Sequence, residues 1–114
     1  MSIVSIWKIV YTEQAERDLR GIYEYIAFSL LEPEIAKNQT SRIMDIVAKL
    51  SDLPLRFPLY EKDPWRSKGL RVLPVNNYLA FYLPVETRET VAVIRIMYGG
   101  RNIEEQLRGL DTNK

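Results

Sequence analysis

The sequence contains no cysteine and no histidine among its 114 residues. Without these side chains the chain cannot build a Ser-His-Asp or Cys-His catalytic centre, carry out thiol redox chemistry or hold zinc with its usual ligands. Any chemistry must use carboxylates, lysine, arginine, tyrosine, serine or threonine. We therefore expect no metal and no cofactor.

The sequence also lacks a long apolar run. No stretch approaches the roughly 20 apolar residues that a membrane span requires. Residues 1–11 place Lys8 inside an apolar segment and show neither the basic leader nor the small-residue cleavage site of a signal peptide. The absence of cysteine is compatible with a reducing compartment. These features predict a cytoplasmic protein that does not contact a membrane.

What is present is sufficient for a folded core. With 46% hydrophobic residues, a chain of 114 residues can stabilise itself without disulfide or metal crosslinks. We predict a single domain over residues 1–114. Sixteen basic and fifteen acidic residues leave a net charge of +1, which is too small for the whole-molecule field to indicate a polyanionic partner.

The first half of the chain reads as one strand followed by two helices. Residues 5–11 are rich in β-branched and aromatic residues and predict a strand. Thr12 is suited to cap a helix, and apolar residues at three- and four-residue spacing predict that helix over residues 13–31. Pro33 marks a break, after which helical spacing continues to about residue 51.

The second half predicts strands. Residues 53–68 hold three prolines and six charged residues, which excludes a regular element. Apolar runs over residues 70–75, 78–85 and 90–98 are separated by short polar connections of hairpin length, so we expect an antiparallel meander. Asn102 could cap a short terminal helix.

This order of elements predicts an α+β fold in two layers. A four-stranded, mostly antiparallel twisted sheet would carry the two N-terminal helices on one face, with a short C-terminal helix after the last strand. The opposite face would be left to water, to the short helix or to a partner. We expect the function to reside on that face.

The two halves of the chain carry net charges of opposite sign. Residues 1–55 carry six basic and eight acidic side chains, whereas residues 56–114 carry ten basic and seven acidic ones. The excess of lysine and arginine therefore lies on the loop and the meander. It indicates either a solvated sheet surface or contact with phosphate groups.

Two arginines interrupt strongly apolar strands. Arg71 and Arg95 need either a charged partner or open solvent at these positions. One interpretation is an ion pair within the sheet, for example with Glu86 or Glu89. The other is that the arginines bind a phosphate or an acidic partner.

Two further features are candidates for binding. Tyr98 and Arg101 flank a Gly-Gly pair whose flexible backbone would let a ligand approach closely. Trp65 in the irregular loop is either a lid over the edge of the core or a platform for stacking. The candidate residues for binding a target or another partner protein are Lys62, Trp65, Arg66, Lys68, Arg71, Arg95, Tyr98 and Arg101.

The sequence resembles the RelE/ParE superfamily of toxins from bacterial type II toxin-antitoxin modules. The resemblance extends over nearly the whole chain and implies the same βααβββ fold that the periodicity predicts. The segments that carry it, specific through their order and spacing, include LSDLP at residues 50–54, GLRVLPV at 69–75, YLAFY at 78–82 and VIRIMYGGRNI at 93–103.

The superfamily contains two activities. RelE-like members are metal-free endonucleases that cut mRNA on the ribosome, and ParE-like members act on DNA gyrase. Where the resemblance to RelE-like sequences implies a catalytic arginine, this chain has Leu79, and a catalytic tyrosine is replaced by Leu107. Only the arginine after the glycine pair, Arg101, is retained.

The depleted nuclease positions favour a ParE-like toxin that inhibits DNA gyrase and is neutralised by a cognate antitoxin. No catalytic residue is assigned under this interpretation. The alternative is a ribosome-dependent mRNA endonuclease, whose partners would be the ribosome and mRNA. A third interpretation is a partner that binds antitoxin without toxicity. The residues available to a nuclease are Lys68, Arg71, Arg95, Tyr98 and Arg101.

Overall fold

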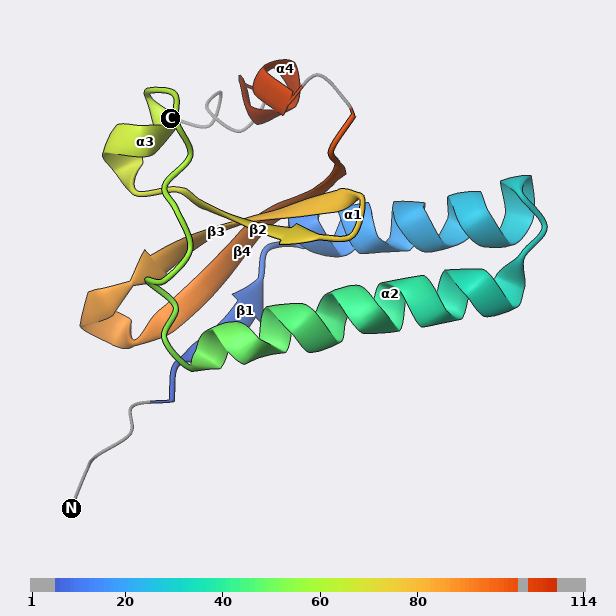
Figure 1. Cartoon of the computed structure of the whole chain (residues 1–114), viewed down its shortest axis with the longest axis horizontal. Helices are drawn as coiled ribbons and strands as arrows, with labels where there is room; N and C mark the ends of the chain where they lie inside the picture. The colour runs from blue at the N-terminus through green and yellow to red at the C-terminus, as the bar shows by residue number, and fades with distance from the viewer. Residues whose placement is uncertain (1–5, 101–102, 109–114) are drawn as a thin grey trace.

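The computed structural model describes residues 6–100 and 103–108. It confirms the α+β fold, with the two long helices packed on one face of a four-stranded sheet (Figure 1). The elements are β1 (Lys8–Tyr11), α1 (Glu13–Glu24), η1 (Tyr25–Ser29), α2 (Pro33–Ala48), η2 (Lys49–Ser51), α3 (Trp65–Lys68), β2 (Arg71–Val75), β3 (Tyr78–Val85), η3 (Glu86–Arg88), β4 (Thr90–Tyr98) and α4 (Ile103–Arg108).

The strands lie in the order β1-β4-β3-β2. The meander of β2, β3 and β4 is antiparallel, as predicted, and β1 joins it as a parallel neighbour of β4. The parallel pairing extends only from Lys8 opposite Thr90 to Tyr11 opposite Val93. Beyond Val93, β4 remains paired with β3 but has no strand on its other side.

The helices differ from the prediction mainly at their junction. The expected helix over residues 13–31 is α-helical only to Glu24 and continues as the π-helix η1. Pro33 occupies the start of α2, as its fixed φ angle favours. The first strand is shorter than predicted within the described residues and begins at Lys8.

The loop over residues 53–68 requires one correction. Although its prolines indicated an entirely irregular segment, it contains the single helical turn α3. Pro64 precedes this turn, where its missing N–H costs no helical hydrogen bond, and Gly69 ends it at a φ of 90°. The predicted Asn102 cap lies outside the described residues.

The main core lies between the helices and the sheet. Ala15 of α1 and Ile43 and Val47 of α2 pack against residues from all four strands. Tyr82 is fully buried in this core, and its hydroxyl donates a hydrogen bond to Pro54 O at 2.6 Å. The helical spacing of apolar residues in the sequence thus identified most of the inward faces of α1 and α2. Leu30 has the same spacing and was expected to face inward, but it lies beyond η1 and is exposed.

A second cluster covers part of the opposite sheet face. Phe81 and Met97 of the sheet pack with Leu107 of α4, and Trp65 of α3 lies half-buried against them. Figure 1 shows α3 and α4 on the side of the sheet away from α1 and α2. The lid interpretation of Trp65 is therefore confirmed.

The partly buried Tyr11 and the buried Tyr82 predict how stability changes in alkali. Burial raises the pKa of Tyr11 and of Tyr82 to about 12. An unfolded tyrosine ionises near pH ~10, so this stabilisation is fully present below about pH 10. It is lost as the pH rises through a folded-state pKa of about 12.

We therefore expect the free energy of unfolding, measured by urea denaturation, to fall above about pH 10. Tyr11→Phe should make this alkaline decline shallower, because it removes one of the two phenols. An equally steep decline in Tyr11→Phe would contradict the assignment.

Candidate binding groove at the open edge of the sheet

A groove of about 640 Å³ lies beside the part of β4 that extends beyond β1, on the side opposite β3. One wall is α1 with the start of η1, which contribute Arg17, Gly21 and Tyr25. Ile96 and Tyr98 of β4 and Gln106 of α4 line the remainder. The groove exists because β1 ends at Tyr11 and the chain then turns into α1.

Backbone groups of β4 are directed into this groove. Gly99 N–H donates to Asn77 O at 2.8 Å, which indicates that alternate residues of β4 bond to β3. The intervening residues, Ile96 and Tyr98, direct their backbone groups to the open side. Within the described part of the chain, no hydrogen bond to Ile96 O or Tyr98 N–H is found.

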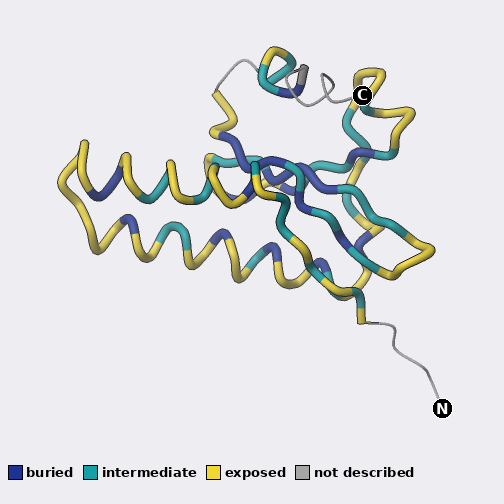
Figure 2. The backbone as a smooth tube through the Cα atoms, turned by 180° about the vertical axis from the view of Figure 1, so that it is seen from behind, coloured by how far each residue is buried: buried dark blue, intermediate teal, exposed yellow. Residues whose placement is uncertain are grey.

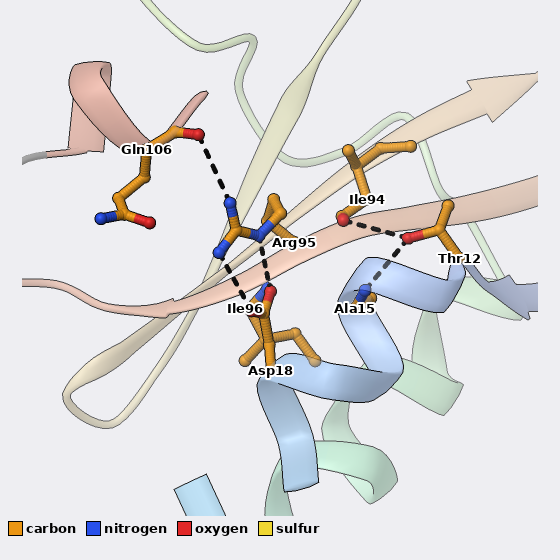
Figure 3. Close-up of polar contacts among 7 residues, drawn as sticks. All are labelled: Thr12, Ala15, Asp18, Ile94, Arg95, Ile96 and Gln106. Atoms are coloured by element: carbon orange, nitrogen blue, oxygen red, sulfur yellow. Dashed lines mark hydrogen bonds and ion pairs between the residues drawn. The ribbon is translucent and has the colours of Figure 1, made fainter. Parts of the chain in front are cut away.

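Side chains of the α1 segment satisfy the nearer part of the open edge (Figure 3). The Thr12 hydroxyl donates to Ile94 O at 3.1 Å and accepts from Ala15 N–H at 3.1 Å, so it caps α1 and continues the sheet bonding. The Asp18 carboxylate accepts from Ile96 N–H at 2.9 Å. These contacts position α1 beside β4.

Asp18 also forms a two-pronged ion pair with Arg95. Arg95 Nε lies 2.7 Å from one carboxylate oxygen and Nη2 lies 3.0 Å from the other. Both side chains are only 11% exposed. Arg95 Nη1 also donates to Gln106 O of α4 at 3.4 Å, as Figure 3 shows. The guanidinium therefore links the two helical walls of the groove to the strand between them.

The ion pair expected for Arg95 exists, but its partner is Asp18 of α1, not Glu86 or Glu89. The sequence carried a signal for this partner. Asp18 lies three residues after Ala15 and four before Ile22, so a carboxylate falls on the apolar face of the helix. A charged group on that face requires a partner.

Arg71 occupies the opposite edge of the sheet, on β2. It donates to Phe57 O at 2.6 Å and to Leu55 O at 3.1 Å. These bonds attach the loop that follows α2 to the sheet. Arg71 and Arg95 therefore lie in separate places, and each has bonds within the chain.

The other basic candidates surround α3 and do not line the groove. Lys62 forms an ion pair with Glu104 of α4, and the hydrogen bond to that carboxylate raises the pKa of Lys62. Lys68 Nζ lies 5.0 Å from the centroid of the Trp65 ring. Arg66 is exposed on the same turn.

The structure thus separates the candidate residues. Tyr98 and Arg95 lie at the groove, Arg71 at the far sheet edge, and Lys62, Trp65, Arg66 and Lys68 around α3. Arg101 lies outside the described residues. A binding role for each stays a prediction.

Tyrosines provide the apolar surface of the groove. The rings of Tyr78 and Tyr98 meet edge to face, with centroids 5.8 Å apart. Burial raises the pKa of Tyr78, and the nearby Tyr98 and Tyr25 add to that shift. Aromatic rings of this kind combine a large contact area with hydroxyl groups that can bond a partner. The groove is therefore suited to an extended peptide segment.

Neither a metal site nor a membrane-spanning helix is found in the described part of the chain. No group of three or more metal-ligating side chains comes together among residues 6–100 and 103–108. None of the helices in these ranges is both long and apolar enough to cross a bilayer.

The fold is shared with toxins from solved toxin-antitoxin systems. A chain of the chromosomal ParDE system from P. aeruginosa matches with a TM-score of 0.68 and 22% identity, over 82% of this chain and 97% of that one. The RelBE2 toxin-antitoxin complex from Mycobacterium tuberculosis matches with a TM-score of 0.61 and 19% identity, over 82% and 98%. These likenesses define the class as the RelE/ParE toxin fold.

The match to a protein family is more specific than the likeness in fold. The family described as the ParE toxin of the type II toxin-antitoxin system, parDE, matches residues 9–103. The chain belongs to this ParE toxin family. A sequence comparison with curated proteins found no significant match.

Proposed function

We propose that this chain arrests growth by binding DNA gyrase and that a cognate antitoxin neutralises it. The observation that carries the proposal is that Arg71, at the start of β2, and Arg95, within β4, both bond to other groups of the chain. Arg95 is bonded to Asp18 and Gln106, and Arg71 is bonded to two loop carbonyls. Their guanidinium groups therefore hold structural elements in place.

This arrangement supports a binding toxin over an mRNA endonuclease. Metal-free cleavage of a phosphodiester needs cationic groups that converge on the phosphate as charge develops. Arg71 and Arg95 instead lie apart, and Leu79 packs in the second core cluster at the position where the resemblance implies a catalytic arginine.

The groove supports an antitoxin as its occupant. An unpaired strand edge can be extended by a strand from another chain, with backbone hydrogen bonds providing affinity. The open groups of Ile96 and Tyr98 and the neighbouring tyrosines offer both parts of such a contact. We propose that an extended segment of the antitoxin lies here.

Gyrase assays test the proposed target. We expect the purified chain to inhibit DNA supercoiling or to trap gyrase–DNA cleavage complexes, and the antitoxin to reverse the effect. Unchanged gyrase activity at concentrations that arrest cells would refute the target. New mRNA 5′ ends in the ribosomal A site would establish the endonuclease instead, and absence of arrest would favour a non-toxic antitoxin partner.

A further inference from the structure

The end of the α1–α2 hairpin carries an apolar surface that the groove does not use. Its members, here called the hairpin tip, are Phe28, Leu30, Leu31 and Ile35, and each is exposed. None of them lines the groove. Figure 2 shows exposed residues at this end, and Figure 1 shows that the hairpin extends beyond the sheet.

Leu31 is the least expected residue of the hairpin tip. It adopts a φ of 58°, a left-handed conformation that glycine and asparagine adopt more readily than leucine. Its side chain is 77% exposed, so it gains little from burial within the chain. Neither the backbone nor the core therefore accounts for a leucine here.

The local backbone adds a second irregularity. Tyr25–Ser29 form a π-helix, and Phe28 within it is 68% exposed. Its ring lies edge to face with that of Tyr23, with centroids 6.5 Å apart. Short π-helical segments are frequent at functional sites. Four exposed apolar side chains within residues 28–35 form the kind of patch that marks a protein contact.

The charges around the hairpin tip indicate which kind of partner it can bind. Residues 24–35 contain Glu24, Glu32 and Glu34 and no basic residue, and all three carboxylates are exposed. Nucleic acid and anionic lipid would be repelled by this rim. A second copy of the chain, docked tip to tip, would place acidic rims opposite each other. The rim instead complements a surface bearing lysine and arginine.

We propose that the hairpin tip is the surface with which the toxin engages its target, and that it docks on an apolar protein patch bordered by Lys and Arg. This inference rests on the proposed function, because it assigns a place on the chain to target binding. It separates that place from the groove assigned to the antitoxin.

Leu31→Asn is the principal test, with Leu53→Asn as its matched control. Leu53 also has a left-handed φ, 56°, and is 62% exposed, but it lies beyond the other end of α2. Asparagine suits both backbones, so both variants should fold. We expect Leu31→Asn to weaken binding to purified gyrase at least about tenfold, or about 1.4 kcal/mol, and to weaken growth arrest. Leu53→Asn should act as wild type, and both variants should keep full antitoxin affinity.

A charge reversal tests the chemistry of the partner. Glu32→Lys should weaken target binding, whereas Glu16→Lys, an exposed change in the first turn of α1, should not. Stronger binding by Glu32→Lys would indicate an anionic partner and overturn the proposal.

The remaining outcomes separate the two proposals. If wild-type toxin arrests growth and Leu31→Asn is equally potent, or if Leu31→Asn loses antitoxin affinity, the assignment of the hairpin tip fails while the toxin function stands. If wild type arrests growth without affecting gyrase, the gyrase target fails, and the arrest assay still decides the role of the tip. If wild type causes no arrest, both proposals fail.

Discussion

Asp18→Ala is expected to lower the free energy of unfolding by about 3–5 kcal/mol, because it leaves a buried guanidinium without its counter-charge. The carboxylate accepts from Arg95 Nε, Arg95 Nη2 and Ile96 N–H. Its removal therefore strands a charge and also a backbone donor at the edge of β4. Urea denaturation followed by circular dichroism would measure the loss.

Two companion variants make this test specific. Glu13→Ala removes the exposed partner of Arg17 on the same helix and should change stability little, because surface pairs contribute little. Combining Asp18→Ala with Arg95→Met should recover part of the loss, since no buried charge remains. An effect of Asp18→Ala no larger than that of Glu13→Ala would show that the ion pair does not hold the groove together.

Gly21→Trp is expected to reduce antitoxin affinity at least about 100-fold, or about 2.7 kcal/mol, by filling the groove. Nothing in the fold requires glycine at this position. An added Cβ would meet no atom within 4 Å, and glycine inside a helix is less stable than alanine. Glycine at this position lowers the stability of α1. Because it lies on the wall of the groove, it also leaves room for the backbone of a bound segment.

The controls for this variant lie on the same helix. Gly21→Ala should raise the free energy of unfolding by about 0.5–1 kcal/mol and leave binding nearly unchanged. Arg20→Trp places the same side chain at an exposed neighbour that does not line the groove, and should bind antitoxin normally. Calorimetric titration of the antitoxin would compare the three. Equal affinities for Gly21→Trp and Arg20→Trp would place the antitoxin elsewhere.

Local pattern accounts for the elements that the sequence predicted well. The strands over residues 78–85 and 90–98 match β3 and β4, because polar turns separate two apolar runs of high β-propensity. The same reasoning missed the π-helix η1, whose apolar residues at Ile26 and Ala27 continue the inward face of the helix. It also missed α3, a single turn between a proline and a glycine.

The candidate site was predicted less completely. Arg95 was selected because it interrupts an apolar strand, and Tyr98 because it flanks the glycine pair. Their neighbours in the groove, Gly21, Tyr25 and Gln106, are unremarkable in sequence. These residues come from three elements, and only the folded sheet places them around one groove. The hairpin tip was missed for a related reason. The sequence does not show that a leucine is exposed, because its φ angle and its surroundings are known only in the folded chain.

The sequence by itself determined the order of elements, the inward faces of the helices and the absence of histidine and cysteine chemistry, since these depend on composition and short-range periodicity. Tertiary structure alone decided that β1 stops beside Val93 and that Asp18 meets Arg95 across 77 residues. It also decided that Arg71 bonds to carbonyl groups of the loop after α2. Pairing between distant polar groups depends on sheet order and on where a strand ends. Local periodicity carries no information on either.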